Sequence, residues 1–285
     1  MAVTNFVPDI WSARILSNLS RLAVSGACVN RNYEGDITRA GDSVKITNFV
    51  DPTIGTYTAH SDITIEDIDD ATQSLLINQQ KYFAFELDDV EKAQSVSGGA
   101  VMDEQIKRAS YGLKNVLDAF TFTTMAAGAS ASAPDHQIAE ATISTAAGAY
   151  DALVAWSVVL DNADVPEEER FAVVTPAFHG LLLKDDRFVK AGDDLAMRTR
   201  QNGRVGQAAG FDIHKSNNLP DGAGAGAGKA MIAGYRGATT LAEQIVSVEA
   251  FRLEKRFADG VKGLHVYGAK VTRPTGLVVA DVIVS

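Results

Sequence analysis

Alternating apolar and polar positions over residues 79–88 predict a strand that leads directly into the start of a helix. The segment reads QQKYFAFELDDVEKAQS as far as position 95. Phe83 and Phe85 fall on one face of the expected strand, opposite small and acidic residues. Asp88 or Asp89 is expected to cap the following helix, because its carboxylate can accept the free amide hydrogens of the first turn.

The same acidic residues admit a second interpretation, a carboxylate cluster for acid–base or metal chemistry. Glu86 and Asp88 share a face in strand register, and Asp89 follows them. No His or Cys lies nearby in the sequence to complete such a site. Helix capping is therefore the preferred interpretation.

A long amphipathic helix is predicted over residues 100–127. Its apolar stripe advances in steps of four and three residues, through Met102, Ile106, Ala109, Leu113, Val116 and Phe120. At ~1.5 Å per residue such a helix is about 40 Å long. It can serve as a core helix, as a structural spine, or as both. A coiled-coil dimer is less favoured, because the heptad pattern stops after few turns.

Residues 36–80 predict an extended ribbon with little bulk. Val44 and Ile46 begin a strand, and the stretch 49–70 consists mainly of Thr, Asp, Ile and Gly. A two-stranded ribbon is marginally stable on its own in water. It is therefore expected to lie on another surface, either of the same molecule or of a neighbour.

The remaining pattern predicts a mixed α/β region. The expected elements, in chain order, are a short helix over 9–24, a helix over 144–160, a buried strand over 171–174, a helix from 176 to 183, a mobile loop over 190–210, strands over 210–214 and 231–235, and terminal strands over 245–284. In the helix over 144–160, five residues fall on related faces, at Tyr150, Leu153, Val154, Ser157 and Val158. Asp259-Gly260 is a two-residue hairpin signal within the terminal strands. The fold class indicated is α+β with two lobes.

Composition narrows the class of protein. The chain has 285 residues, is 46% hydrophobic and 22% charged, and has a formal net charge of −10, which disfavours a dedicated nucleic-acid binder. No apolar run is long enough for a membrane span, and the first residues do not have the pattern of a secretory signal. The single Cys28 excludes an intrachain disulfide and is expected to be a buried, inert thiol, as suits a reducing cytoplasm.

The glycine–alanine run 222–228, followed by Lys229, superficially resembles a phosphate-binding loop. Ala223 stands where that motif needs its first Gly, and Ala230 replaces the Ser or Thr that would hold magnesium. A dinucleotide fingerprint fails as well, because Ala227 occupies the place of the third Gly. The run is therefore expected to be a flexible surface loop.

No other chemical motif emerges. The five histidines are isolated from one another, at His60, His136, His179, His214 and His265. Each is interpreted as a surface or structural residue. The basic cluster of Arg252, Lys255 and Arg256 is typical of a solvated strand face, or of an edge that pairs subunits. We therefore expect no catalytic, cofactor-binding or metal-binding residues, and no cofactor.

Five segments together resemble the major capsid proteins of tailed bacteriophages. They are, in order, WSARILSNL, NRNYEGDI followed by GDSVKI, QQKYFAFELDDVEKAQS, SNNLP and GLHVYGAKVTRP, and they span residues 11–274. The resemblance is to the branch similar to the Salmonella-phage coat protein, which uses a separate scaffolding protein. It implies the Hong Kong 97-type capsid fold.

The resemblance implies a domain organisation. Residues 1–35 would form an N-terminal arm and 36–80 the extended loop. Residues 81–133 and 242–285 would form a peripheral domain with the spine helix over 100–127, and residues 134–241 an axial domain. Some relatives cross-link subunits through a Lys and an Asn. Lys45 lies in the ribbon, but no acceptor or helper carboxylate matches, so this chemistry is not carried over.

The function implied is structural: many copies form an icosahedral shell around double-stranded DNA, which is held without specificity. A scaffolding protein and a portal are the expected partners, a decoration protein is left open, and no membrane is involved. The expected location is the virion capsid, after assembly in the host bacterial cytoplasm. An encapsulin-like cellular compartment is the alternative. A soluble α/β enzyme with a site between His179 and His214 is a distant third.

Overall fold

The computed structural model describes most of the chain in eleven stretches. They are residues 24–32, 43–49, 54–57, 62, 70–88, 98–129, 136–185, 206–224, 226, 228–253 and 257–285. The predicted helix over 9–24, all but Val24, lies outside these residues, as do Asp89 and its proposed cap, His60, and most of the loop over 190–210. Asp88 is the last residue of a strand, as expected.

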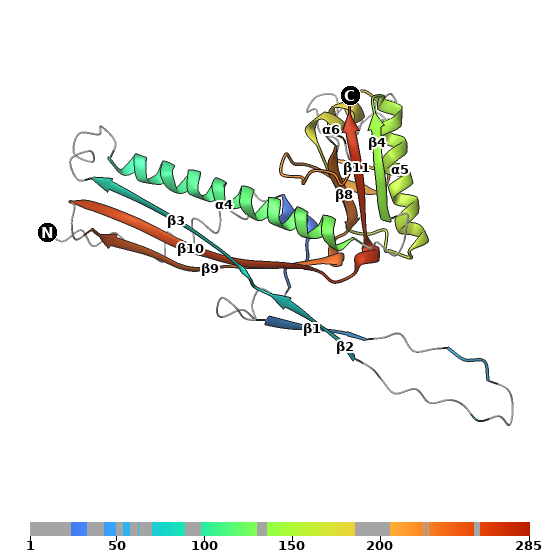
Figure 1. Ribbon diagram of the computed structural model, residues 1–285, viewed down its shortest axis with the longest axis horizontal. Coiled ribbons are helices and arrows are strands. Elements are labelled where there is room, and N and C mark those ends of the chain that lie inside the picture. Colours follow the sequence, from blue (N-terminus) through green and yellow to red (C-terminus); the bar gives the residue numbers. More distant parts are fainter. Residues whose placement is uncertain are drawn as a thin grey trace.

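A six-stranded mixed sheet forms one end of the molecule (Figure 1). Its strands, in spatial order, are β4 (Gln137–Ile143), β11 (Leu277–Val284), β8 (Lys229–Tyr235), β5 (Arg170–Val174), β7 (Phe211–Lys215) and β6 (Gln207–Ala208). The last strand of the chain, β11, pairs with β4 and β8. Residues 277–284 therefore join this sheet, whereas the sequence had placed them, with the rest of 242–285, in the peripheral domain.

Two helices, α5 (Ala146–Asn162) and α6 (Pro176–Leu183), accompany this sheet, and both begin at a threonine cap. The hydroxyl of Thr145 accepts a hydrogen bond from the amide of Gly148 (3.1 Å), and that of Thr175 accepts one from Phe178 (3.3 Å). Capping satisfies amides that the first turn of a helix leaves free. Both elements had been predicted from the sequence.

The buried face of α5 differs from the predicted one. Its buried residues are Ala149, Leu153, Trp156 and Leu160, whereas Val154 and Val158 are exposed. The ring of Trp156 stacks on Phe178 of α6, with centroids 5.9 Å apart. The position of this large ring sets which side of the helix faces the core, and the two valines lie off that side.

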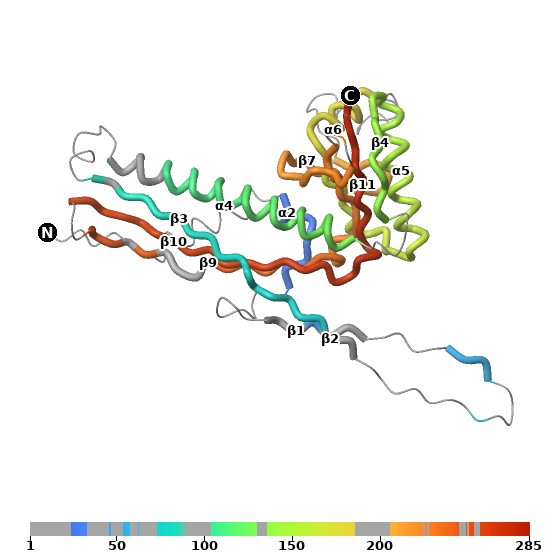
Figure 2. Tube along the Cα trace, viewed as in Figure 1, coloured from blue at the N-terminus to red at the C-terminus, as the bar shows by residue number. Residues whose placement is uncertain are grey.

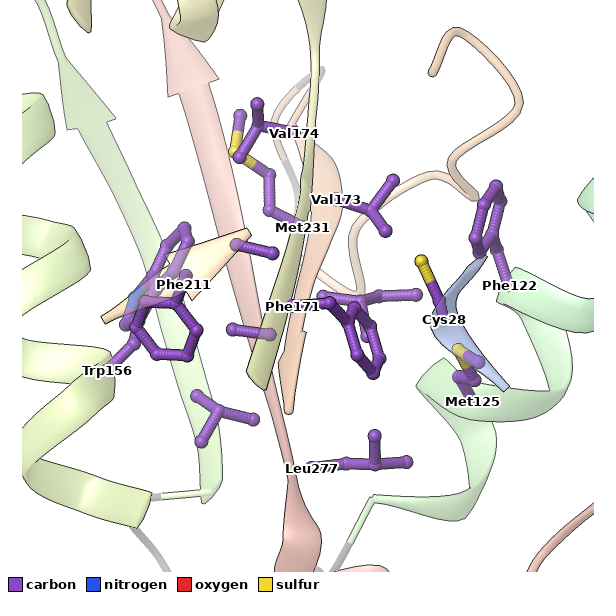
Figure 3. Close-up of a cluster of buried hydrophobic side chains, with 14 of the residues drawn as sticks. Cys28, Phe122, Met125, Trp156, Phe171, Val173, Val174, Phe211, Met231 and Leu277 are labelled. Atoms are coloured by element: carbon purple, nitrogen blue, oxygen red, sulfur yellow. The ribbon is translucent and has the colours of Figure 1, made fainter. Parts of the chain in front are cut away.

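The main hydrophobic core surrounds the six-stranded sheet on both of its faces. In Figure 3, Trp156 and Phe211 lie on one side of the strands, and Cys28, Phe122 and Met125 lie on the other. All five residues of β5 are buried, as expected for a central strand covered on both faces. Cys28 comes from the short helix α2 (Ser25–Cys28).

A three-stranded antiparallel sheet extends from this core, with the long helix α4 (Gly98–Gly128) alongside it (Figure 1). Its strand order is β3 (Gln79–Asp88), β10 (Ala258–Val271), β9 (Thr239–Arg252). The helix packs mainly on β10, where the ring of Phe120 meets Tyr267 edge-on at 5.3 Å. The predicted long helix and the strand over 79–88 are confirmed.

The buried seam of α4 includes polar residues that the apolar stripe had skipped. Ile106, Ser110, Leu113, Leu117, Thr121 and Met125 are buried, whereas Val116 is 42% exposed. The hydroxyls of Ser110 and Thr121 each donate to the carbonyl four residues earlier (2.8 Å). Their hydrogen-bonding needs are met within the helix, so they can be buried at little cost.

The predicted hairpin at Asp259-Gly260 is wrong by several residues. Asp259 already pairs with Arg252 across β9 and β10, and the Leu253 amide donates to Ala258 O (3.2 Å), so the two strands are paired up to positions that precede Asp259. The guanidinium of Arg252 donates to the Asp259 carboxylate at 2.9 Å. A Cβ on Gly260 would lie 2.7 Å from Phe251 Cζ, so this glycine makes room for a ring and does not form a turn.

A two-stranded ribbon projects away from both sheets (Figure 1). Its strands β1 (Ser43–Phe49) and β2 (Asp70–Leu76) are antiparallel, from the pair Ser43↔Leu76 to the pair Phe49↔Asp70. Residues 54–57 lie far out beyond this pairing (Figure 2). The predicted 36–80 segment thus contains a two-stranded ribbon at residues 43–49 and 70–76, whereas Gln79 and Gln80 already belong to β3.

Candidate assembly surfaces and buried polar groups

The root of the ribbon packs on the three-stranded sheet. A small apolar cluster joins Ile46, Leu75 and Ile77 to Ala242 and Val266, with Leu264 at its edge. Polar contacts accompany it: the Gln73 amide donates to Thr272 O (3.3 Å), and Lys270 Nζ donates to Ser74 O (3.0 Å). The ribbon is therefore anchored at its base.

Beyond the root, the ribbon presents apolar side chains to solvent. Ile54 is 97% exposed and Tyr57 is 67% exposed. Two further aromatic residues, Tyr82 on β3 and Phe257 beside β10, are about as exposed. Clustered exposed apolar groups typically mark surfaces that another molecule covers. The ribbon and the three-stranded sheet are thus the candidate assembly surfaces.

Charged side chains on the three-stranded sheet are largely paired. Lys262 forms an ion pair with Glu249 (2.8 Å) and lies over the ring of Phe251. Arg252 of the predicted basic cluster pairs with Asp259, while Lys255 and Arg256 lie outside the described residues. Lys45 is in β1, but its side chain is not among those described.

The four described histidines occupy separate places. His136 bonds to Leu277 O through Nδ1 (2.9 Å), and His265 is buried in β10. Burial lowers the pKa of His179, with a further contribution from Lys215. Burial also lowers the pKa of His214, against the opposing effect of Asp212. Within the described residues, no group of three or more His, Cys, Asp or Glu side chains is arranged to hold a metal ion.

Cys28 is fully buried, as expected. Burial raises the pKa of its thiol far above the usual range; Asp118 adds to the effect and Arg236 opposes it. A thiol held in its neutral form is a poor nucleophile. In this fold the residue packs in the core.

The glycine–alanine run 222–228 is held in place, which corrects the expectation of a flexible loop. The amide of Gly224 donates to Asp281 Oδ2 (2.7 Å), and that of Gly226 donates to Glu140 Oε2 (2.8 Å). The amide of Gly222 closes the loop onto Gly228 O (2.9 Å). Each of these four glycines faces one or both carboxylates so closely that an added Cβ would collide with them. The glycines were the signal for this packing, because a residue without a Cβ lets a carboxylate approach the backbone this closely.

Gly222→Ala is therefore expected to destabilise the subunit by about 1–2 kcal/mol, because overpacked sites must shift backbone or side chains. The new methyl would overlap Oδ1 of Asp281, which is itself buried and has little room to move. Gly206→Ala is the matched control, since nothing lies within 4 Å of its added Cβ. Urea unfolding of the unassembled subunit measures both; equal midpoints would contradict the packing described here.

Among the described residues, no helix is long and apolar enough to cross a membrane. The comparison with protein families decides what kind of protein this is: a family described as phage capsid protein matches residues 40–280. The chain belongs to this family. No curated protein sequence matches this capsid protein.

Solved structures agree with the family. A structure from Mycobacterium phage Che8 is 28% identical, covers 98% of both chains and superposes with a TM-score of 0.72. The capsid structure of the cyanophage P-SCSP1u is 15% identical, covers 91% of this chain and 87% of the other, and has a TM-score of 0.67. The mature capsid of bacteriophage PhiM1 is 17% identical, covers 84% and 82%, and has a TM-score of 0.63.

These comparisons confirm the α+β class, the Hong Kong 97-type fold and the resemblance to major capsid proteins of tailed bacteriophages. This capsid protein is a structural shell protein of the virion. Many copies of the same chain form the shell.

Proposed function

We propose that this capsid protein forms an icosahedral shell that encloses double-stranded DNA. The observation that carries the proposal is the projecting ribbon, whose residues Ile54 and Tyr57 are exposed on the isolated chain. Apolar side chains so far from the chain's own core gain burial only against another molecule. In a shell, the neighbouring copy supplies that surface, and many repeated contacts of this kind hold the particle together.

The proposed domain organisation keeps the boundaries expected from the sequence, with one change. Residues 1–35 are the N-terminal arm and 36–80 the extended loop. The peripheral domain comprises 81–133 and residues 242–276, whose strands β9 and β10 form a sheet with β3, and α4 packs mainly on β10 of this sheet. The axial domain comprises 134–241 together with β11, because β11 pairs within the six-stranded sheet.

The acidic charge supports a non-specific relation to DNA. The chain carries 36 acidic and 26 basic residues, and proteins that bind DNA tightly neutralise phosphates with Lys and Arg. A wall of net negative charge lets packed DNA lie against it without adhering. A separate scaffolding protein, a portal and assembly in the host cytoplasm complete the proposal, together with a purely structural role without catalysis.

Assembly of the purified chain tests this function. We expect closed particles of uniform diameter in negative-stain electron microscopy when the chain is expressed with its scaffolding protein, after size-exclusion chromatography. Particles that form around a protein cargo, in a host without any portal, would instead indicate a cellular compartment. A monomer under all assembly conditions would refute the shell.

A further inference from the structure

A cluster of buried polar groups lies where β9 and β10 meet the segment that follows α2. Four side chains there have buried polar atoms without a hydrogen-bond partner, and they are Thr239, Glu243, His265 and Tyr267. Burial raises the pKa of the Tyr267 hydroxyl to about 12. Unpaired buried polar atoms are rare in folded proteins and mark strained or functional places.

Glu243 stands at the centre of the cluster, and its two oxygens face different partners. Oε1 forms an ion pair with Arg31. Oε2 lies 3.5 Å from His265 Nε2, within ion-pair distance but without hydrogen-bond geometry. The side chains of Glu243 and His265 are both 1% exposed, whereas that of Arg31 is 24% exposed. Arg31 alone of the three can turn towards water.

Arg31 belongs to residues 24–32, which we call the docked segment. Its backbone adds to the edge of β9: the Asn30 amide donates to Thr239 O (2.9 Å), and the Leu241 amide donates to Asn30 O (3.0 Å). At the other end, the buried carboxylate of Asp118 on α4 accepts from the amide and hydroxyl of Ser25 (3.0 and 2.6 Å). Glu243 therefore connects His265 to the attachment of this segment.

We propose that Glu243 is shared between Arg31 and His265, so that proton uptake by His265 loosens the docked segment. Histidine is the side chain that ordinarily changes charge between about pH 5 and 8. An imidazolium would donate to the unpaired Oε2 and neutralise the carboxylate. Its positive charge would also repel the nearby guanidinium. Both effects weaken the hold on Arg31, so attachment falls as pH falls.

The other charged groups around the site leave this coupling intact. Lys81 is the register partner of His265 on β3, and its side chain is exposed. On α4, Lys114 lies over the ring of Tyr111, and Asp118 is engaged with Ser25. Arg236 donates to Val29 O (3.1 Å) and so supports the docked segment at every pH in this range. Among the described residues, Glu243 is the carboxylate that lies within ion-pair distance of His265.

Hydrogen exchange of the full-length, unassembled chain tests the coupling at two local amides, Asn30 and Leu241. Rates at pH 7.5 and 5.5 are each divided by the intrinsic rate at that pH. We expect protection of both amides to fall about tenfold on acidification, a typical size for coupling between two sites. The amide of Ala230, bonded to Pro220 O in the six-stranded sheet, is the internal reference and should keep its protection.

Two variants decide whether His265 is the cause. His265→Gln keeps a polar side chain that cannot become charged, so the tenfold loss should disappear. Arg31→Gln should reduce protection already at pH 7.5 and leave little further loss at pH 5.5. An equal acid effect in His265→Gln, an unchanged acid effect in Arg31→Gln, or loss of protection at Ala230 together with Asn30 would each overturn the proposal.

Discussion

A chain in which residues 50–69 are replaced by Asn-Gly is expected to fold normally and to form no stable shells. The deletion starts beyond the paired part of the ribbon, where Phe49 and Asp70 are the last register partners. Asn-Gly is the preferred two-residue connection of antiparallel strands. The root cluster around Ile46 and Leu75 stays in place, so the subunit loses little of its own packing.

Shell formation should fail because the deletion removes the outermost contacts of the ribbon. Ile54 and Tyr57 are lost, and with them the apolar area that a neighbouring subunit would bury. Negative-stain electron microscopy with the scaffolding protein measures assembly, and thermal unfolding of the unassembled subunit measures folding. Val154→Ser is a matched control, since it removes an exposed apolar side chain on α5, far from the ribbon. Normal particles from the shortened chain would refute the assignment of the ribbon to assembly.

Local patterns in the sequence were enough to predict the elements that depend on local causes. The strand β5 and the helix α6 follow from an apolar run, the cap at Thr175 and the proline after it. The long helix α4 was predicted from the apolar residues that recur at steps of four and three along residues 100–127. Residues close together in the chain carry the information for these three elements, so a single sequence is enough to predict them.

The errors arose where distant residues decide the outcome. Asp259-Gly260 reads as a turn, but Phe251 on the facing strand needs the space above the glycine. The glycine–alanine run was interpreted as a flexible surface loop. Glu140 and Asp281, far away in the chain, accept hydrogen bonds from its backbone amides. The polar cluster at Glu243 likewise forms only when β9, β10 and the docked segment meet. No spacing rule within a short window could reveal these contacts.

Gly268→Ala is expected to produce the largest loss of stability of any single methyl addition considered, about 3 kcal/mol. Gly268 lies in β10. It faces Leu76 and Ile77, at the point where the chain passes from β2 to β3 at the root of the ribbon. An added Cβ would overlap the carbonyl oxygen of Leu76 and lie 2.9 Å from Ile77 Cα. These are backbone atoms, which cannot rotate aside as a flexible side chain can, so the strands themselves would have to separate.

Gly112→Ala is the matched control, and it should act in the opposite direction. Gly112 lies exposed in the interior of α4, and nothing lies within 4 Å of its added Cβ. Alanine there should stabilise the subunit by roughly 0.5–1 kcal/mol, because it restricts the unfolded chain and favours the helix. Urea unfolding of the unassembled subunit separates the two effects. Equal midpoints for Gly268→Ala and the natural chain would show that the ribbon root is not clamped against β10. A large loss instead would show that the close backbone contact at Gly268 holds the ribbon root against β10.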